Sequence, residues 1–234
     1  MLTPYGDREW SVALLIGGAA AIAAWSIVGV LGVLLVAAAV LAALAFFRDP
    51  PRAVPVGLSA GAMLSPADGR VSKIFDVEHH VATEGPARIV RIFLSVLDVH
   101  VNRAPCDGTV VAVVHAPGRY LDARTEESAR VNESNLMIMR LRDGRRVGVR
   151  QVSGAIARRI VCAIAPGGTI GRGERYGMIK FGSTTELILP SPESVTLRVS
   201  EGDVVRGGVT LLAELAPVTE EDGSPAPAPA PPRA

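Results

Sequence analysis

The chain has 234 residues, enough for one globular domain with appendages. Its formal net charge is only +1, which gives no electrostatic reason to expect nucleic acid as a partner. Only Lys73 and Lys180 are lysines, so a lysine-linked cofactor has two candidate positions. Cys106 and Cys162 form no C-x-x-C pair and are predicted to be reduced core residues, although the sequence also allows a disulfide between them.

An uncharged run extends from Trp10 to Phe47. A membrane-spanning helix needs about 20 apolar residues, so the run is too long for one upright helix and close to two short ones. Gly29 and Gly32 near its middle allow a tight reversal. The sequence therefore favours an apolar helical hairpin in residues 1–47 over a single tilted span. A secretory signal fits poorly, because its apolar region is usually about 7–15 residues long.

The charges that flank this run predict its orientation. Arg48 and Arg52 follow it directly, whereas Arg8 before it lies between Asp7 and Glu9. The excess of positive charge after the run places the following domain on the cytoplasmic side of the cell membrane. We expect the run to anchor the protein without supplying chemistry.

The segments after the run differ in composition. Residues 48–62 are rich in Pro, Gly and Ala and are predicted to be a linker. Strand patterns dominate residues 63–216. Residues 217–234 form a Pro/Ala tail that is too poor in apolar side chains to fold, so we predict it to be disordered.

Within residues 63–216, short β-branched or alternating segments at 110–116, 136–142 and 146–152 are bounded by Gly, Pro or Asp-Gly and predict strands. The polar segment 124–134 predicts a short helix or loop.

Two further segments, 167–181 and 201–215, share a pattern of Gly, a β-branched residue, a second Gly and an apolar strand, which resembles barrel-sandwich folds. The expected fold is mainly β: a barrel-sandwich-like β domain with an N-terminal apolar helical hairpin. A swinging-arm carrier is disfavoured, because Lys180 lacks a methionine on both sides.

The stretch MIKFGSTTELILP at 178–190 predicts two strands interrupted by Gly182, Ser183 and two threonines. A turn would explain the interruption. A reactive peptide bond is the alternative, because glycine leaves room around its carbonyl group and tolerates strained backbone.

Other polar residues could activate the Ser183 hydroxyl. In FLSVLDVHVNRAP (93–105), Asp98, His100 and Asn102 alternate and would share one face of a strand. A lone histidine in a strand is more often structural than catalytic, and Asp68 in LSPADGR fits a plain turn. Together, however, Asp68, His100 and Ser183 supply the parts for activating a hydroxyl nucleophile.

Other reaction classes have little support in the sequence. No G-x-S-x-G elbow is present, so an α/β-hydrolase is not indicated. No Cys/His cluster has the spacing of metal ligands, and no metal is predicted.

Five segments occur in order along the chain: FFRDPPR (46–52), SPADGRV (65–71), LDVHVNRAP (97–105), QVSGAIARRIVC (151–162) and GERYGMIKFGSTTELILP (173–190). This set resembles the phosphatidylserine decarboxylase family, and most of all its short, archaeal-type branch. The Phe-Gly-Ser-Thr motif resembles the family's self-cleavage site. The apolar N-terminus resembles its membrane anchor.

The resemblance implies that the chain cuts itself between Gly182 and Ser183. The Ser183 hydroxyl would attack the Gly182 carbonyl, and elimination and hydrolysis would leave a pyruvoyl group at position 183. His100, oriented by Asp68, would be the base. The fragments 1–182 and 183–234 would stay associated, and the family suggests a homodimer.

The implied substrate is phosphatidylserine in the lipid bilayer, decarboxylated to phosphatidylethanolamine with the pyruvoyl group as electron sink. Arg158 and Arg159 would contact the lipid phosphate, although a solvated basic face explains them as well. Many family members have His-x-x-His where this chain has His100 and Arg103. The sequence leaves open whether His100 serves both steps or another group protonates the product.

Two other functions compete with the decarboxylase. A membrane-anchored barrel-sandwich adaptor predicts long helical hairpins flanking the β domain, and none is visible in the sequence. A membrane-bound serine peptidase predicts a site that leaves its own chain intact.

Overall fold

The structure, a computed structural model, describes residues 1–155, 159–180 and 183–217. Three α-helices, two 3-10 helices and fourteen strands lie in these ranges. The helices are η1 (Pro4–Gly6), α1 (Asp7–Val28), α2 (Val30–Phe46), α3 (Glu126–Val131) and η2 (Pro192–Ser194). The strands are β1 (Ala62–Leu64), β2 (Gly69–His80), β3 (Gly85–Leu94), β4 (Val101–Arg103), β5 (Gly108–Ala116), β6 (Ser134–Arg140), β7 (Arg146–Val152), β8 (Ile160–Cys162), β9 (Thr169–Ile170), β10 (Arg175–Ile179), β11 (Ser183–Pro190), β12 (Val195–Leu197), β13 (Val204–Val205) and β14 (Leu211–Leu215).

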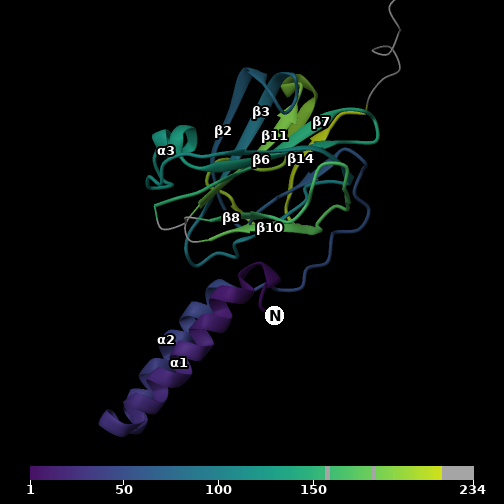
Figure 1. The fold of residues 1–234 in the computed structure, drawn as a ribbon. Coiled ribbons are helices and arrows are strands. Elements are labelled where there is room, and N and C mark those ends of the chain that lie inside the picture. Colours follow the sequence, from purple (N-terminus) through teal and green to yellow (C-terminus); the bar gives the residue numbers. More distant parts are fainter. Residues whose placement is uncertain (156–158, 181–182, 218–234) are drawn as a thin grey trace, which may run out of the picture.

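The fold is mainly β with an N-terminal pair of apolar helices, as predicted (Figure 1). The largest sheet has eight strands in the order β13-β2-β3-β11-β7-β6-β5-β9. Two three-stranded sheets, β4-β10-β8 and β1-β14-β12, complete the domain. The interruption predicted at 182–185 is wrong at its C-terminal end, because Ser183, Thr184 and Thr185 already pair with β3 as part of β11. β10 ends at Ile179, and β10 and β11 belong to different sheets. The disordered tail predicted for 217–234 lies outside the described residues, apart from residue 217.

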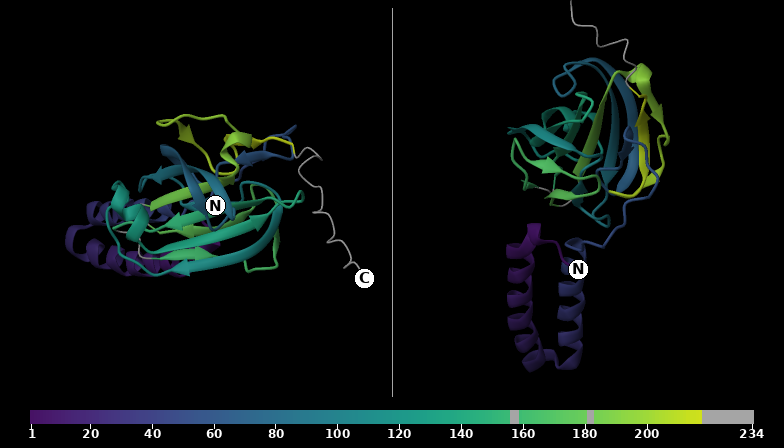
Figure 2. Two further views of the ribbon diagram at one scale, coloured as in Figure 1. Left: turned by 90° about the horizontal axis from the view of Figure 1, so that it is seen from above. Right: turned by 90° about the vertical axis from the view of Figure 1, so that its right-hand side faces the viewer.

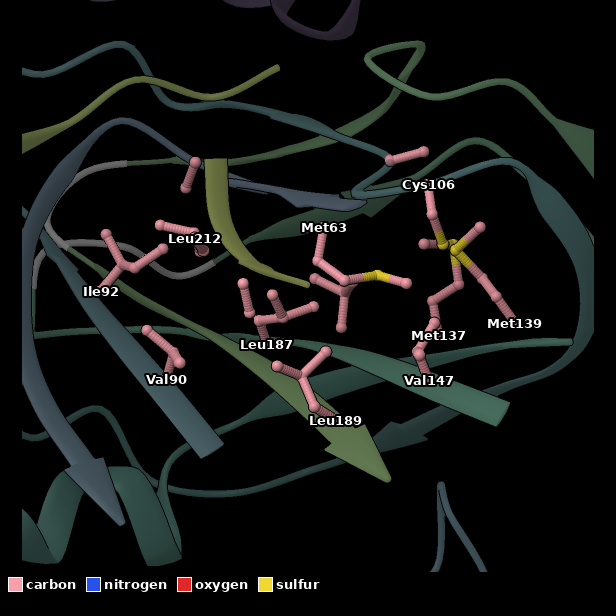
Figure 3. Close-up of a cluster of buried hydrophobic side chains, with 14 of the residues drawn as sticks. Met63, Val90, Ile92, Cys106, Met137, Met139, Val147, Leu187, Leu189 and Leu212 are labelled. Carbon is pink, nitrogen blue, oxygen red and sulfur yellow. The ribbon is translucent and has the colours of Figure 1, made fainter. Parts of the chain in front are cut away.

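The main hydrophobic core lies against the inner face of the large sheet (Figure 3). Leu187 and Leu189 of β11 are fully buried there beside Val90 and Ile92 of β3. Burying each leucine side chain stabilises the fold by about 1.5–3 kcal/mol. Because side chains alternate along a strand, Ser183 at the start of β11 points to the same face as these leucines.

Both cysteines are free thiols, as predicted. Cys106 lies in this core, where burial raises the pKa of its thiol to about 12.

The two N-terminal helices run side by side and form a hairpin (Figure 2). The chain reverses at Gly29, whose φ of 73° strains residues with a side chain. Gly17 packs against Val40, and Gly32 against Ala24, so the small residues let the helices approach closely. At about 1.5 Å per residue, α1 is about 33 Å long, close to the roughly 30 Å of a bilayer's hydrocarbon core. The segment Pro4–Val28 is long and apolar enough to span a membrane, and its apolar part is not buried by protein.

The base of the hairpin is joined to the β domain at the side where β8 and β10 lie (Figure 1). The Thr3 and Asp49 backbone N–H groups donate to Phe47 O and Met1 O, both at 2.8 Å, which ties the N-terminus to the exit from α2. Phe46 and Phe47 are buried against Met178 of β10.

A buried ion-pair cluster continues this connection. The Asp49 carboxylate accepts from the Arg103 guanidinium at 2.9 Å and lies 2.6 Å from Nε of Arg175. Asp49 and Arg103 are both buried. Because Arg103 and Arg175 belong to the paired strands β4 and β10, Asp49 fixes the end of the hairpin to both strands.

Replacing Asp49 by Asn tests this connection. Removing one partner of a buried pair leaves a charge without compensation, which typically costs about 3–5 kcal/mol. We expect Asp49→Asn to lower the thermal unfolding midpoint of the full-length protein in detergent micelles by several degrees. The control is Asp76→Asn, which breaks a half-exposed pair with Arg88 and should shift the midpoint far less. Equal shifts in the two variants would contradict the assignment.

Candidate active site

Ser183 is the first residue of β11 and lies inside the protein, paired with Leu94 at the end of β3. Its Oγ is buried and has no hydrogen-bond partner within the described parts of the chain. Leaving a buried hydroxyl unpaired costs about 1–3 kcal/mol, so such an atom in a native fold requires an explanation. Gly182 lies outside the described residues, so the predicted cleavage bond itself is not described.

His100 lies directly before β4 and is fully buried. Its Nδ1 is 3.0 Å from the backbone oxygen of Asp98. Since a carbonyl oxygen only accepts, Nδ1 carries the hydrogen and Nε2 carries the lone pair. Burial lowers the pKa of His100 to about 4, against the opposing effects of Asp98. The imidazole is therefore neutral at pH 7 and has a nitrogen that can accept a proton.

Strand pairing brings the segments around His100 and Ser183 together. Ile179, the last residue of β10, donates its N–H to His100 O at 3.2 Å, and the chain then runs from β10 towards Ser183. Asn102 Nδ2 on β4 donates to Thr185 Oγ1 on β11 at 3.2 Å. His100 lies two residues before Asn102, and Ser183 lies two residues before Thr185.

A buried amide chain fixes this arrangement further. Gln151 of β7 donates from Nε2 to Asn102 Oδ1 at 2.9 Å and accepts from Asn135 Nδ2 at 3.2 Å. Satisfied polar networks of this kind hold strands in one register, because every broken bond would leave a buried polar group unpaired. The sequence did not indicate this network.

Asp98 does not share a strand face with His100 and Asn102, because β4 begins only at Val101. Asp98 belongs to a turn, and its carboxylate accepts from the N–H and the hydroxyl of Ser95, both at 2.8 Å.

Asp68 lies in the turn before β2. Both of its carboxylate oxygens accept from the Arg52 guanidinium at 2.6 Å, and one also accepts from the Gly207 N–H at 2.8 Å. The negative charge of Asp68 raises the pKa of His100, but it is the smallest of the contributions to the pKa shift of that ring. The orienting role predicted for Asp68 stays a prediction.

Arg103 occupies the position where many relatives of the resembled family have a second histidine. Its guanidinium binds the Asp49 carboxylate and, at 3.0 Å, the backbone oxygen of Gly173. An arginine does not release a proton in proteins. Arg103 therefore holds the hairpin exit in place and does not serve as an acid.

The start of α1 also reaches this region. Lys180, which is buried and follows β10, forms an ion pair with Glu9. Arg159 lies 3.8 Å from the same carboxylate and is exposed. Arg158 lies outside the described residues, and the lipid-phosphate role predicted for Arg158 and Arg159 stays a prediction.

The hairpin also contributes directly to the surroundings of His100. The ring of Phe46, the last residue of α2, lies 4.5 Å from the His100 ring, measured between centroids. The prediction that the run 10–47 supplies no chemistry stays a prediction, but this contact shows that Phe46 packs directly on the ring of His100. The sequence did not indicate this contact.

Within the described ranges, no three His, Cys, Asp or Glu side chains gather where they could hold a metal ion. The absence of a metal from the reaction stays a prediction.

Comparisons with known proteins point to one family. The model of the family described as phosphatidylserine decarboxylase matches residues 41–213. Proteins named phosphatidylserine decarboxylase proenzyme are similar over most of their length. The one from Granulibacter bethesdensis is 43% identical over 175 residues, covering 74% of this chain and 70% of its own. Those from Cereibacter sphaeroides and Ralstonia nicotianae are 45% and 44% identical, covering 73% and 74% of this chain and 73% and 78% of their own.

The shielding by Phe46 is testable. We expect Phe46→Ala to admit water to His100 and to raise its pKa from about 4 towards the ordinary value of 6.5. NMR titration of the ring protons in detergent micelles measures this, with His100→Gln used to assign the signal. The control is Phe75→Ala, because Phe75 belongs to a separate cluster on β2. An unchanged His100 pKa in Phe46→Ala would contradict the shielding role.

Proposed function

The chain belongs to the phosphatidylserine decarboxylase family, and we propose that this carboxy-lyase makes its own catalytic group by cutting the bond between Gly182 and Ser183. The observation that carries the proposal is the buried Ser183 hydroxyl, which has no hydrogen bond to any described residue. A pyruvoyl group formed from Ser183 has no such hydroxyl, so maturation would remove the unpaired group. The word "proenzyme" in the relatives' names agrees with a precursor that is processed.

The residues present can carry out the cleavage. Neutral His100 takes the proton from Ser183 Oγ as the oxygen attacks the Gly182 carbonyl, and the Ser183 nitrogen receives a proton as the peptide bond becomes an ester. Removal of the Ser183 α-proton then breaks the bond between Oγ and Cβ. This leaves a carboxylate on Gly182 and an unsaturated residue at position 183. Water converts that residue into the pyruvoyl group and releases ammonia.

In the mature enzyme the pyruvoyl group would supply an electron sink for the loss of CO2 from the serine headgroup. The chain's own contribution is proton transfer in a dry site. Neutral His100 can take a proton from the substrate ammonium and return it to the carbon that loses CO2, which leaves the ring unchanged after one turnover. Arg103 cannot replace it, because Asp49 and Gly173 O hold its guanidinium. We therefore assign both the base in self-cleavage and the acid that protonates the product to His100. The Asp68 charge stabilises the protonated form of His100.

The strand pairing supports a lasting association of the two fragments. β11 belongs to the fragment 183–234, yet it pairs along its whole length with β3 and also with β7, both in the fragment 1–182. Cutting before Ser183 therefore leaves a central strand of the large sheet in place. A homodimer, contacts of Arg158 and Arg159 with lipid phosphate, and a cytoplasmic β domain belong to the proposal through the family resemblance and the charge pattern.

The proposal predicts the behaviour of a serine variant. Ser183→Ala lacks the nucleophile, so it should run as one full-length band on a denaturing gel and carry no carbonyl-reactive group, whereas the wild type should give two fragments. The control is Ser194→Ala, because Ser194 Oγ donates only to Ser191 O at 2.9 Å, in η2. Normal splitting of Ser183→Ala would rule out the assigned nucleophile. An intact wild-type band would favour the adaptor or the peptidase.

The buried state of His100 predicts a pH profile for self-cleavage. The base must be neutral, and its pKa of about 4 lies below the ordinary 6.5. The rate should therefore stay constant from pH 8 to pH 6 and fall only as the pH drops through about 4. Precursor from a brief cell-free synthesis, diluted into buffers of different pH, gives the rates. His100→Ala should be slower by about 10²–10⁴-fold. An inflection near pH 6.5 would contradict a buried base.

A further inference from the structure

The turn that follows β3 displays two apolar side chains to solvent. Val96 is 47% exposed and Leu97 is 79% exposed. The turn is held in shape from within, because Asp98 N–H donates to Ser95 O at 2.9 Å and the Asp98 carboxylate accepts two bonds from Ser95. A rigid turn with apolar side chains at its tip loses little conformational entropy when it enters an apolar medium.

The position of this turn indicates that the apolar medium is the lipid bilayer. The guanidinium of Arg48 donates to Leu97 O and, at 2.9 Å, to Ala45 O. Arg48 follows the apolar helix α2 by two residues, so it lies where the hairpin leaves the hydrocarbon and meets the headgroups. The hydrogen bond from Arg48 brings the Leu97 backbone to the same depth. The exposed apolar tip is thus continuous with the surface of the hairpin.

A cavity of about 380 Å³ opens behind the turn. Its walls include Phe93, Leu94, Ser95 and Val96 on one side and Ala123 and Arg124 on the other. Most of the exposed lining is apolar, and the charged pair of Arg124 and Asp122 stands at its edge.

The cavity is lined by neighbours of the strand that begins with Ser183, but not by that strand itself. Leu94 in its wall is the ladder partner of Ser183, and Thr184 Oγ1 donates to the backbone oxygen of Ala123 at 3.4 Å. The cavity therefore lies beside the buried start of β11.

We propose that the turn at residues 95–98 inserts into the bilayer beside the hairpin, and that the cavity behind it admits the headgroup of a phospholipid drawn from that same bilayer. Val96 and Leu97 insert among the acyl chains of the surrounding bilayer lipids, not of the lipid bound in the cavity. Arg124, whose side chain is 75% exposed and pairs with Asp122 of the same loop, receives the lipid phosphate. The inference rests on the proposed function, since it is the amine of this lipid that must reach position 183.

The depth of the turn at residues 95–98 in the membrane is measured with the full-length protein in nanodiscs. An environment-sensitive dye is attached to Leu97→Cys and, as a matched control, to Val81→Cys. Val81 is 60% exposed in the connection between β2 and β3, at the end of the domain away from the hairpin (Figure 1). Wild type treated with the same dye corrects for labelling of Cys162. Phospholipids brominated on their acyl chains should quench the dye at position 97 and leave the dye at position 81 unquenched.

Equal, weak quenching at both positions would overturn the proposal. A second result would also overturn the proposal: in detergent without lipid, the dye at position 97 becomes more shielded from water as the protein concentration rises. The tip would then be a contact between two copies of the chain.

Turnover of bilayer and of monomeric substrate distinguishes an effect on lipid entry from an effect on the chemical reaction. Leu97→Asp should cleave itself as wild type does, and its turnover of long-chain phosphatidylserine in bilayers should fall about tenfold or more, since a carboxylate is disfavoured in the acyl region. Its turnover of monomeric short-chain phosphatidylserine should stay within about twofold of wild type. Val81→Asp should resemble wild type on both substrates.

The phosphate contact has its own variant. Arg124→Gln should raise KM on both substrates, whereas Arg119→Gln, also exposed and on the same loop, should not. If wild type does not decarboxylate phosphatidylserine, the proposed function fails. If wild type is active and Leu97→Asp matches Val81→Asp in bilayers, only the present inference fails.

Discussion

The burial of His100 beneath Phe46 is the contact on which the rest of the site depends. It joins the last residue of the membrane hairpin to the residue that we assign as base. It also removes water from the imidazole, and the resulting low pKa keeps the ring neutral at physiological pH. Asp49, three residues after Phe46, is held between Arg103 and Arg175 and joins the exit from α2 to β4 and β10. The low pKa of His100 comes chiefly from its burial.

This arrangement makes the anchor and the catalytic domain one unit. The start of α1 pairs with Lys180 just before the cleavage motif, and the end of α2 covers His100. An enzyme whose substrate stays in a bilayer benefits from this geometry, because the depth of the hairpin also sets the depth of the site. With the proposed insertion of the turn at residues 95–98, anchor, lipid entry and chemistry would share one side of the β domain.

The sequence predicted features that local patterns encode. The helical hairpin, the strands near 110–116, 136–142 and 146–152, and the break before Ser183 all come from composition or periodicity within a few residues. Contacts between distant segments left no such pattern. Glu9 and Lys180 are 171 residues apart in the chain, and Asp49 and Arg103 are 54 apart. The side chain of Asp98 was misplaced because the start of β4 depends on its pairing with β10, which alternation alone does not specify.

The central claim is that Ser183 becomes a pyruvoyl group through cleavage of its own peptide bond. The most direct test is the intact mass of the purified wild-type chains under denaturing conditions. The account predicts two chains, with the one that begins at residue 183 lighter by one ammonia than a fragment with an N-terminal serine. A single chain of full mass, or a cut fragment that keeps its serine, would contradict it.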